Sequence, residues 1–215
     1  MNGLAEILIM LLMLTNFRLL GSSRLPACIS TVAFQAVLLG AITLTTAGWR
    51  LSPWVIILTA STLAVKGVLL PALLRKAVRD VGISREIQPF VGFGTSVLLG
   101  AVLLSVCFII SRPFLDSAAS EQSRMLIPGA MFTIMSGMFI IITRKKALTQ
   151  VLGYLAMENG IYAFGTSLAV EAPFLVEIGM LLDVFVAVFV MGIVIYRINQ
   201  EFDHMDTHKL TELRD

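Results

Sequence analysis

Charged residues and cysteines are scarce in this chain of 215 residues. Asp, Glu, Lys and Arg together make up 14% of it, whereas soluble domains hold about 25%. The formal net charge is only +2, so the composition does not indicate a nucleic-acid-binding surface. The two cysteines, Cys28 and Cys107, both fall in apolar stretches. We interpret each as a small hydrophobic side chain rather than as half of a disulfide or a metal ligand.

Motifs of an independent enzyme are also missing. The sequence has no phosphate-binding loop, no cysteine cluster for an iron–sulfur centre and no nucleophile–base motif. The two histidines, His204 and His208, lie four residues apart in a polar tail with no cysteine nearby. We interpret them as solvated residues rather than metal ligands. We therefore expect no catalytic centre, metal site or cofactor-binding site in this chain.

Long hydrophobic runs make up most of the sequence. Hydrophobic residues account for 57% of the chain, and the mean hydropathy is +0.90. Each run has about 20 residues, enough to cross a hydrocarbon core of about 30 Å as a helix. The sequence predicts an all-α membrane bundle of about seven transmembrane helices in a single domain, 1–215. The predicted helices are 1–20, 27–47, 53–74, 89–111, 125–143, 147–170 and 174–196, followed by a polar tail.

Two features of these runs bear on topology. The first run lacks a basic start and a cleavage signal, so we interpret it as a helix rather than a cleaved signal peptide. Cytoplasmic loops carry an excess of Lys and Arg. With the N-terminus outside, twelve of the 16 basic residues fall on the inner side and three on the outer side. The inner residues are Arg18, Arg24, Arg75, Lys76, Arg79, Arg85, Arg144, Lys145, Lys146, Arg197, Lys209 and Arg214. We therefore expect the C-terminal tail to be cytoplasmic.

Glu158 is the strongest candidate for a functional group inside a predicted helix. It lies twelve residues after Lys146, which is about 18 Å of helix and close to mid-membrane. A charged group at that depth costs about 2.5 kcal/mol or more and marks a functional site by default. Asn159 lies beside it as a candidate partner or neighbour on a proton path. The alternative is a neutral, hydrogen-bonded carboxylic acid with a structural role.

Lys66 is the natural counter-charge for such an acid. It continues a polar stripe with Thr59 and Thr62 and precedes Pro71, which we expect to kink the helix because proline cannot donate to the carbonyl four residues earlier. A buried lysine can alternate between charged and neutral forms. The alternative is a lysine whose amine reaches the headgroups.

The last predicted helix adds two more acids. Asp183 lies near mid-depth, and Glu177 lies nearer the outer surface, where it fits the mouth of a path or a solvated helix start equally well. Titratable groups in three helices at similar depth are the minimum for a proton relay. The predicted relay residues are Glu158, Lys66, Asp183, Glu177 and Asn159.

Four segments carry a family resemblance. They are GYLAMENG at 153–160, APFLVEIG at 172–179, VKGVLLP with Lys66 and Pro71, and the closing LTELRD. Together they resemble the hydrogenase-4 component E family, called HyfE, over nearly the whole chain. The segment 144–215, with two helices and the tail, is also similar to the NuoK subunit of respiratory complex I and to the C component of Mrp antiporters. The segment 1–143 holds the other five predicted helices.

The resemblance implies a non-catalytic subunit in the membrane arm of a group 4 NiFe hydrogenase or formate hydrogenlyase complex, in a prokaryotic inner membrane. Its partners would be antiporter-like and other membrane subunits, and its buried acids would help couple electron transfer to proton movement. The NiFe centre and iron–sulfur clusters would belong to partner subunits. Two alternatives stay open: a subunit of an Mrp-like cation/proton antiporter, and a passive scaffold between larger membrane subunits.

Overall fold

The computed structural model describes residues 2–47, 60, 63–80, 89–118, 121–168, 185, 186, 188 and 190–192. The elements are α1 (Asn2–Gly21), α2 (Leu25–Ala47), η1 (Leu63–Leu69), α4 (Leu70–Asp80), α5 (Phe93–Ile110), η2 (Arg112–Ser117), α6 (Glu121–Thr143) and α7 (Ala147–Ser167). Within these ranges no strand is present, and an isolated bridge joins Ala118 and Leu168. The predicted all-α class is confirmed.

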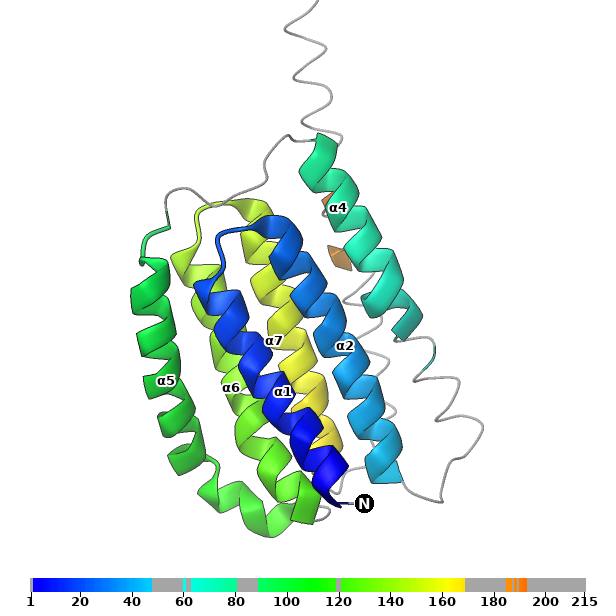
Figure 1. Cartoon of the computed structure of the whole chain (residues 1–215), viewed down its shortest axis with the longest axis vertical. Helices are drawn as coiled ribbons and strands as arrows, with labels where there is room; N and C mark the ends of the chain where they lie inside the picture. Colours follow the sequence, from blue (N-terminus) through cyan, green and yellow to red (C-terminus); the bar gives the residue numbers. More distant parts are fainter. Residues whose placement is uncertain are drawn as a thin grey trace, which may run out of the picture.

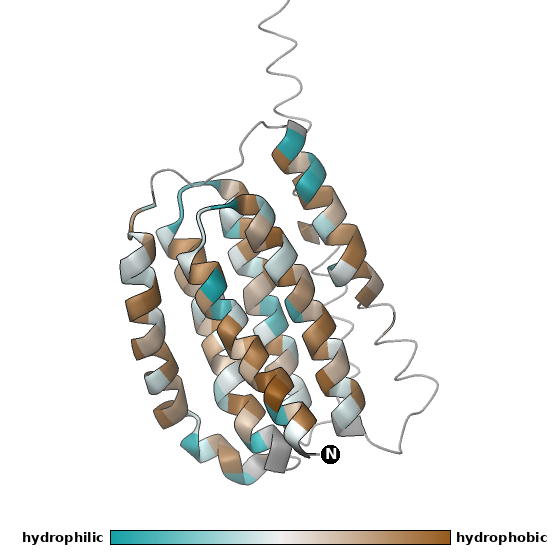
Figure 2. Cartoon of the chain, viewed as in Figure 1, coloured by the Kyte–Doolittle hydropathy of each residue, from teal (hydrophilic) through white to brown (hydrophobic). Residues whose placement is uncertain are grey.

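The long helices lie side by side in one bundle (Figure 1). α7 packs chiefly on α6 and also on α2, while α1 packs on α2, α5 and α6. α5 lies on the outer side of α6, and α4 flanks α2 on the opposite side of the bundle (Figure 1). Apolar residues predominate along α5, whereas the end of α4 is hydrophilic (Figure 2). α7 is therefore the central helix of the described bundle, and α5 is a peripheral one.

Four helices are long and apolar enough to cross a membrane. They are Gly3–Gly21, Leu25–Thr45, Phe93–Ile110 and Arg124–Thr143. α7 has a similar length, 21 residues, but a more polar sequence, and it is covered by its neighbours. The predicted membrane-helix character is confirmed for these four. The count of seven stays a prediction, because most of the helix predicted at 174–196 and part of that predicted at 53–74 lie outside the described residues.

Several helix ends differ from the prediction. α4 continues to Asp80, so the loop predicted to start at Arg75 is wrong. The charged run alternates with apolar residues at helical spacing: Arg75 and Arg79 are exposed, while Leu74 and Val78 are buried. The other shifts are the start of α2 at Leu25, of α5 at Phe93 and of α6 at Glu121, and the end of α7 at Ser167.

Glycines set the close contact between α6 and α7. A Cβ atom at Gly137 would lie 2.5 Å from both Gly153 O and Met157 N. A Cβ atom at Gly160 would lie 2.6 Å from Ile134 N. Small residues let two membrane helices approach at backbone distance. This contact fixes α7 against α6 next to Glu158, so the position of the carboxylate is set by backbone packing.

Candidate functional site

Lys66 lies in an irregular turn that its sequence context explains. η1, which carries it, is π-helical and runs directly into α4, whose second residue is Pro71. Proline lacks the amide needed for the regular helical ladder, and the helix widens just before it. The kink predicted at Pro71 stays a prediction. Because π-helical turns are rare and often occur at functional sites, the turn singles out Lys66.

Lys66 and Glu158 form an ion pair inside the protein. Lys66 Nζ lies 2.8 Å from Glu158 Oε1, and the two side chains are 8% and 4% exposed. Oε1 makes this ion contact, but neither carboxylate oxygen accepts a well-aligned hydrogen bond within the described part of the chain. The pair joins η1 to α7 across the bundle. The structure thus brings the predicted counter-charge to the predicted acid; their role in proton transfer stays a prediction.

Of the other three predicted relay residues, the structure describes only Asn159. Asn159 is 1% exposed, and its Nδ2 atom has no hydrogen-bond partner within the described ranges. Asp183 and Glu177 lie outside the described residues. The structure therefore assembles three of the five predicted residues, Lys66, Glu158 and Asn159, into one buried polar site.

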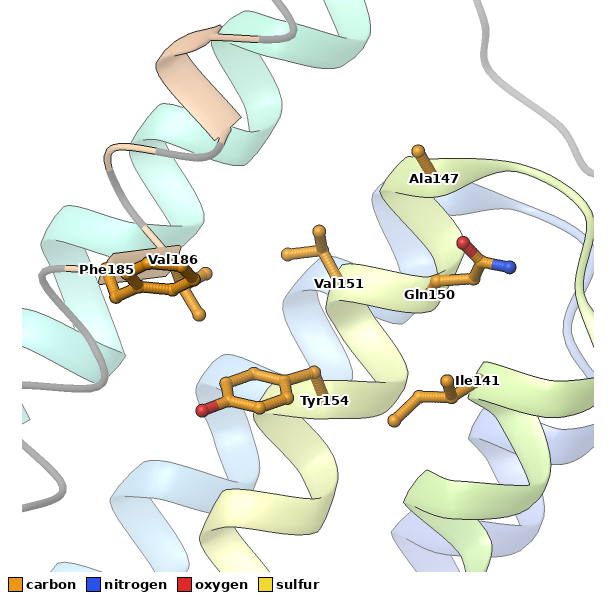
Figure 3. A pocket seen from close by; sticks show the side chains of 7 residues that line it. All are labelled: Ile141, Ala147, Gln150, Val151, Tyr154, Phe185 and Val186. Carbon is orange, nitrogen blue, oxygen red and sulfur yellow. The ribbon is translucent and has the colours of Figure 1, made fainter.

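An apolar pocket of about 470 Å³ lies nearer the start of α7 (Figure 3). It is lined by Ile141, Ala147, Gln150, Val151, Tyr154, Phe185 and Val186. Phe185 and Val186 lie across from Val151 and Tyr154 in the close view (Figure 3). No carboxylate or amine is among the described lining residues, whose only polar groups are the Gln150 amide and the Tyr154 hydroxyl.

A second buried polar cluster joins α1, α2 and α6. Gln35 Nε2 donates to Asn16 Oδ1 at 2.9 Å and to Thr15 Oγ1 at 3.0 Å, and Asn16 Nδ2 donates to Thr133 Oγ1 at 2.8 Å. Asn16, Gln35 and Thr133 are fully buried. This cluster was not among the predicted features. Two amides inside apolar runs were the available signal, since polar side chains in membrane helices bond across helices.

Arg144 also has a place that the sequence did not predict. The residue is 1% exposed, and its guanidinium donates to Leu20 O at 2.8 Å and to Val91 O at 3.1 Å. The guanidinium also lies 4.5 Å from the centroid of the Phe93 ring. A cation at a helix C-terminus satisfies carbonyls that lack a helical partner. Arg144 therefore ties the end of α1 and the start of α5 to the turn between α6 and α7.

Comparison of the sequence with known proteins places the chain in a family. The chain is 32% identical over 192 residues to "Uncharacterized protein Rv0085" of Mycobacterium tuberculosis, covering 89% of this chain and 87% of that protein. It is 27% identical over 205 residues to hydrogenase-4 component E of Escherichia coli K12, covering 95% and 94%. No family model matches the chain, and no solved structure matches it with significance. The similarity extends along almost the whole length of both relatives, and the chain belongs to the hydrogenase-4 component E family.

Proposed function

We propose that this chain is a membrane subunit of a hydrogenase complex, and that its Lys66–Glu158 pair takes part in proton translocation coupled to electron transfer. One observation carries the second half of this proposal: two opposite charges lie 2.8 Å apart with 8% and 4% of their side chains exposed. The family supports the first half, because its named members are components of hydrogenase-4.

The physics of a buried pair explains why it suits coupling. Each charge is tolerated inside the bundle because the other offsets its loss of water. When a proton or a neighbouring charge neutralises one partner, the other is left uncompensated at high cost. The uncompensated charge then attracts the next charged group or favours the uptake or release of a proton. Asp183 and Glu177 are the proposed next groups along the chain of charges, and Asn159 is a proposed polar neighbour.

The arrangement of basic segments supports the proposed orientation. The turn between α1 and α2, the turn between α6 and α7 and the end of α4 all lie at one end of the bundle (Figure 1). These segments hold Arg18, Arg24, Arg75, Lys76, Arg79, Arg144, Lys145 and Lys146. The positive-inside rule assigns this end to the cytoplasm of a prokaryotic inner membrane.

In this proposal, the redox chemistry takes place in other subunits of the complex. The proposed complex contains antiporter-like membrane subunits, and its NiFe centre and iron–sulfur clusters belong to other subunits. Identification of the proteins that purify with this chain tests this. A large hydrogenase subunit among them supports the proposal, while an Mrp-like set without one would make the chain an antiporter component instead.

Glu158→Gln tests the mechanism. Glutamine keeps the size of the side chain but cannot ionise, so we expect the complex to assemble while proton uptake falls about a hundredfold. The measurement is proton uptake by vesicles carrying the assembled complex, with the composition of the complex determined in parallel. Normal uptake in a fully assembled Glu158→Gln complex would leave the chain with a scaffold role.

A further inference from the structure

A small cavity lies at the Lys66 end of the ion pair, between α2, η1 and α7. Its volume is about 10 Å³, which is room for about one water molecule. The described residues that line it are Ala36, Leu39, Gly40, Leu63, Lys66, Asn159 and Tyr162. Three of these carry polar groups, so the cavity offers the two to four polar partners that a buried water needs.

Asn159 supplies an unused donor at this cavity. The residue is 1% exposed, and its Nδ2 has no hydrogen-bond partner within the described part of the chain. A buried donor without an acceptor is costly, and a bound acceptor removes that cost. Lys66 Nζ is also a donor and carries a positive charge. The cavity therefore favours a neutral acceptor, such as water, over a cation.

Tyr162 connects this cavity to α2. Its hydroxyl oxygen lies 3.3 Å from Thr43 Oγ1, and Thr43 Oγ1 donates its proton to Leu39 O at 2.9 Å. Because a hydroxyl has only one proton, Tyr162 is the donor to Thr43. The Tyr162 oxygen keeps a lone pair that can accept a hydrogen bond. A cavity molecule that accepted from Lys66 and Asn159 and donated to Tyr162 would therefore continue the same hydrogen-bond direction to Thr43.

We propose that the cavity binds one water molecule, and that this water with the Tyr162 and Thr43 hydroxyls forms the proton path from the ion pair to the end of the bundle where α2 ends. This inference rests on the proposed function of the Lys66–Glu158 pair. Thr43 lies four residues before Ala47, the last residue of α2, so the path leads away from the basic end of the bundle.

The proton balance along the path is simple. The Lys66 ammonium gives one proton to the water, the water gives one of its own to the Tyr162 oxygen, and Tyr162 gives its hydroxyl proton to Thr43. One N–H bond is lost at Lys66, and each O–H bond broken on the path is replaced by another on the same group. Thr43 releases its own hydroxyl proton towards the end of α2 as it accepts the one from Tyr162, so Lys66 becomes neutral and one proton leaves the path. A proton arriving through Glu158 restores the ammonium.

Two tyrosines on α7 give a matched test. Tyr162 lies four residues after Glu158 and lines the water cavity, whereas Tyr154 lies four residues before it and lines the apolar pocket of Figure 3. Each Tyr→Phe change removes one hydroxyl and keeps the ring. In vesicles with the assembled complex, we expect Tyr162→Phe to lower proton uptake about tenfold or more. Tyr154→Phe should leave it unchanged.

The outcomes separate this inference from the proposed function. Normal uptake in Tyr162→Phe together with loss in Glu158→Gln overturns the path and leaves the ion pair's role intact. Normal uptake in both overturns the proposed function itself. Equal losses in Tyr162→Phe and Tyr154→Phe also overturn the assigned path.

A second pair of variants covers the case in which Tyr162→Phe does not assemble. Thr43→Val removes the next hydroxyl and should lower proton uptake, while Thr45→Val, whose hydroxyl donates to Ile42 O within α2, should not. Normal uptake in Thr43→Val overturns the path.

An experimental structure of the complex tests the water directly. Density within hydrogen-bond distance of Lys66 Nζ and Asn159 Nδ2 is expected, and an empty cavity contradicts the proposal.

Discussion

α7 and α5 have similar lengths but differ in burial and polarity. In α7, 13 of 21 residues are buried, among them Glu158 and Asn159. In α5, only three of 18 residues are buried, and Leu98, Val102 and Ile109 are 71%, 59% and 62% exposed. The apolar helix is on the outside and the more polar helix is inside, since lipid tolerates apolar side chains and penalises polar ones.

This difference indicates where a charge can reside in the protein. α7 carries an acid near its middle because α6, α2 and η1 cover it. α5 has no charged residue within its range, as expected for a helix without such cover. The same rule explains why α7 is absent from the helices whose composition alone suits a membrane.

The largest effect should come from breaking the charge balance around α7. Lys66→Met leaves Glu158 without its counter-charge, and we expect the unfolding free energy to fall by about 3–5 kcal/mol. Glu158→Gln strands Lys66 in the same way. The double variant should lose less than the sum of the two, because neither charge is then stranded. Unfolding of the purified complex in detergent gives the comparison.

An exposed lysine provides the control for that cycle. Lys145 lies at the end of the bundle with its amine 4.7 Å from the centroid of the Phe90 ring. Lys145→Met should cost less than about 1 kcal/mol, the range of an exposed cation–π contact. Additive losses in the Lys66 and Glu158 cycle would mean that the ion contact contributes nothing to stability.

A smaller effect should follow from adding one methyl group to each helix. In α6, the Cβ of Gly137→Ala would lie 2.5 Å from backbone atoms of α7, so the helices must move apart. We expect a loss of about 1–3 kcal/mol. In α5, a Cβ at Gly94 meets nothing within 4 Å, and Gly94→Ala should be neutral or slightly stabilising. Equal effects of the two alanines on unfolding would contradict the tight contact between α6 and α7.

The sequence allowed much of the polar site to be predicted. Glu158 and Lys66 were identifiable because a charge inside an apolar run is expensive and needs a partner. The direct contact between Lys66 Nζ and Glu158 Oε1 could not be predicted, because the two residues belong to elements far apart in the chain. Arg144 shows the limit: as one residue of a basic run it was predicted only to be cytoplasmic, yet it bonds Leu20 O across 124 positions of sequence.

Helix boundaries were harder to predict for a related reason. The run from Arg75 to Asp80 was interpreted as a loop because of its charge, although its apolar residues keep the helical period. In the structure, Leu74, Ala77 and Val78 are buried, and this face extends α4. Hydropathy marks where a chain enters lipid. It does not mark where a helix ends, because an amphipathic helix continues beyond the apolar core.

The smallest effect is expected on the exposed face of α5. Leu98 is 71% exposed, so Leu98→Ala removes few protein contacts, and we expect unfolding to change by no more than about 0.5 kcal/mol. The same truncation at Leu155 in α7, which is 4% exposed, should cost about 2–5 kcal/mol. Both are compared in the purified complex with retention of the partner proteins as a second readout. If Leu98→Ala releases a partner protein, α5 faces protein rather than lipid, and its apolar surface is then an interface within the complex.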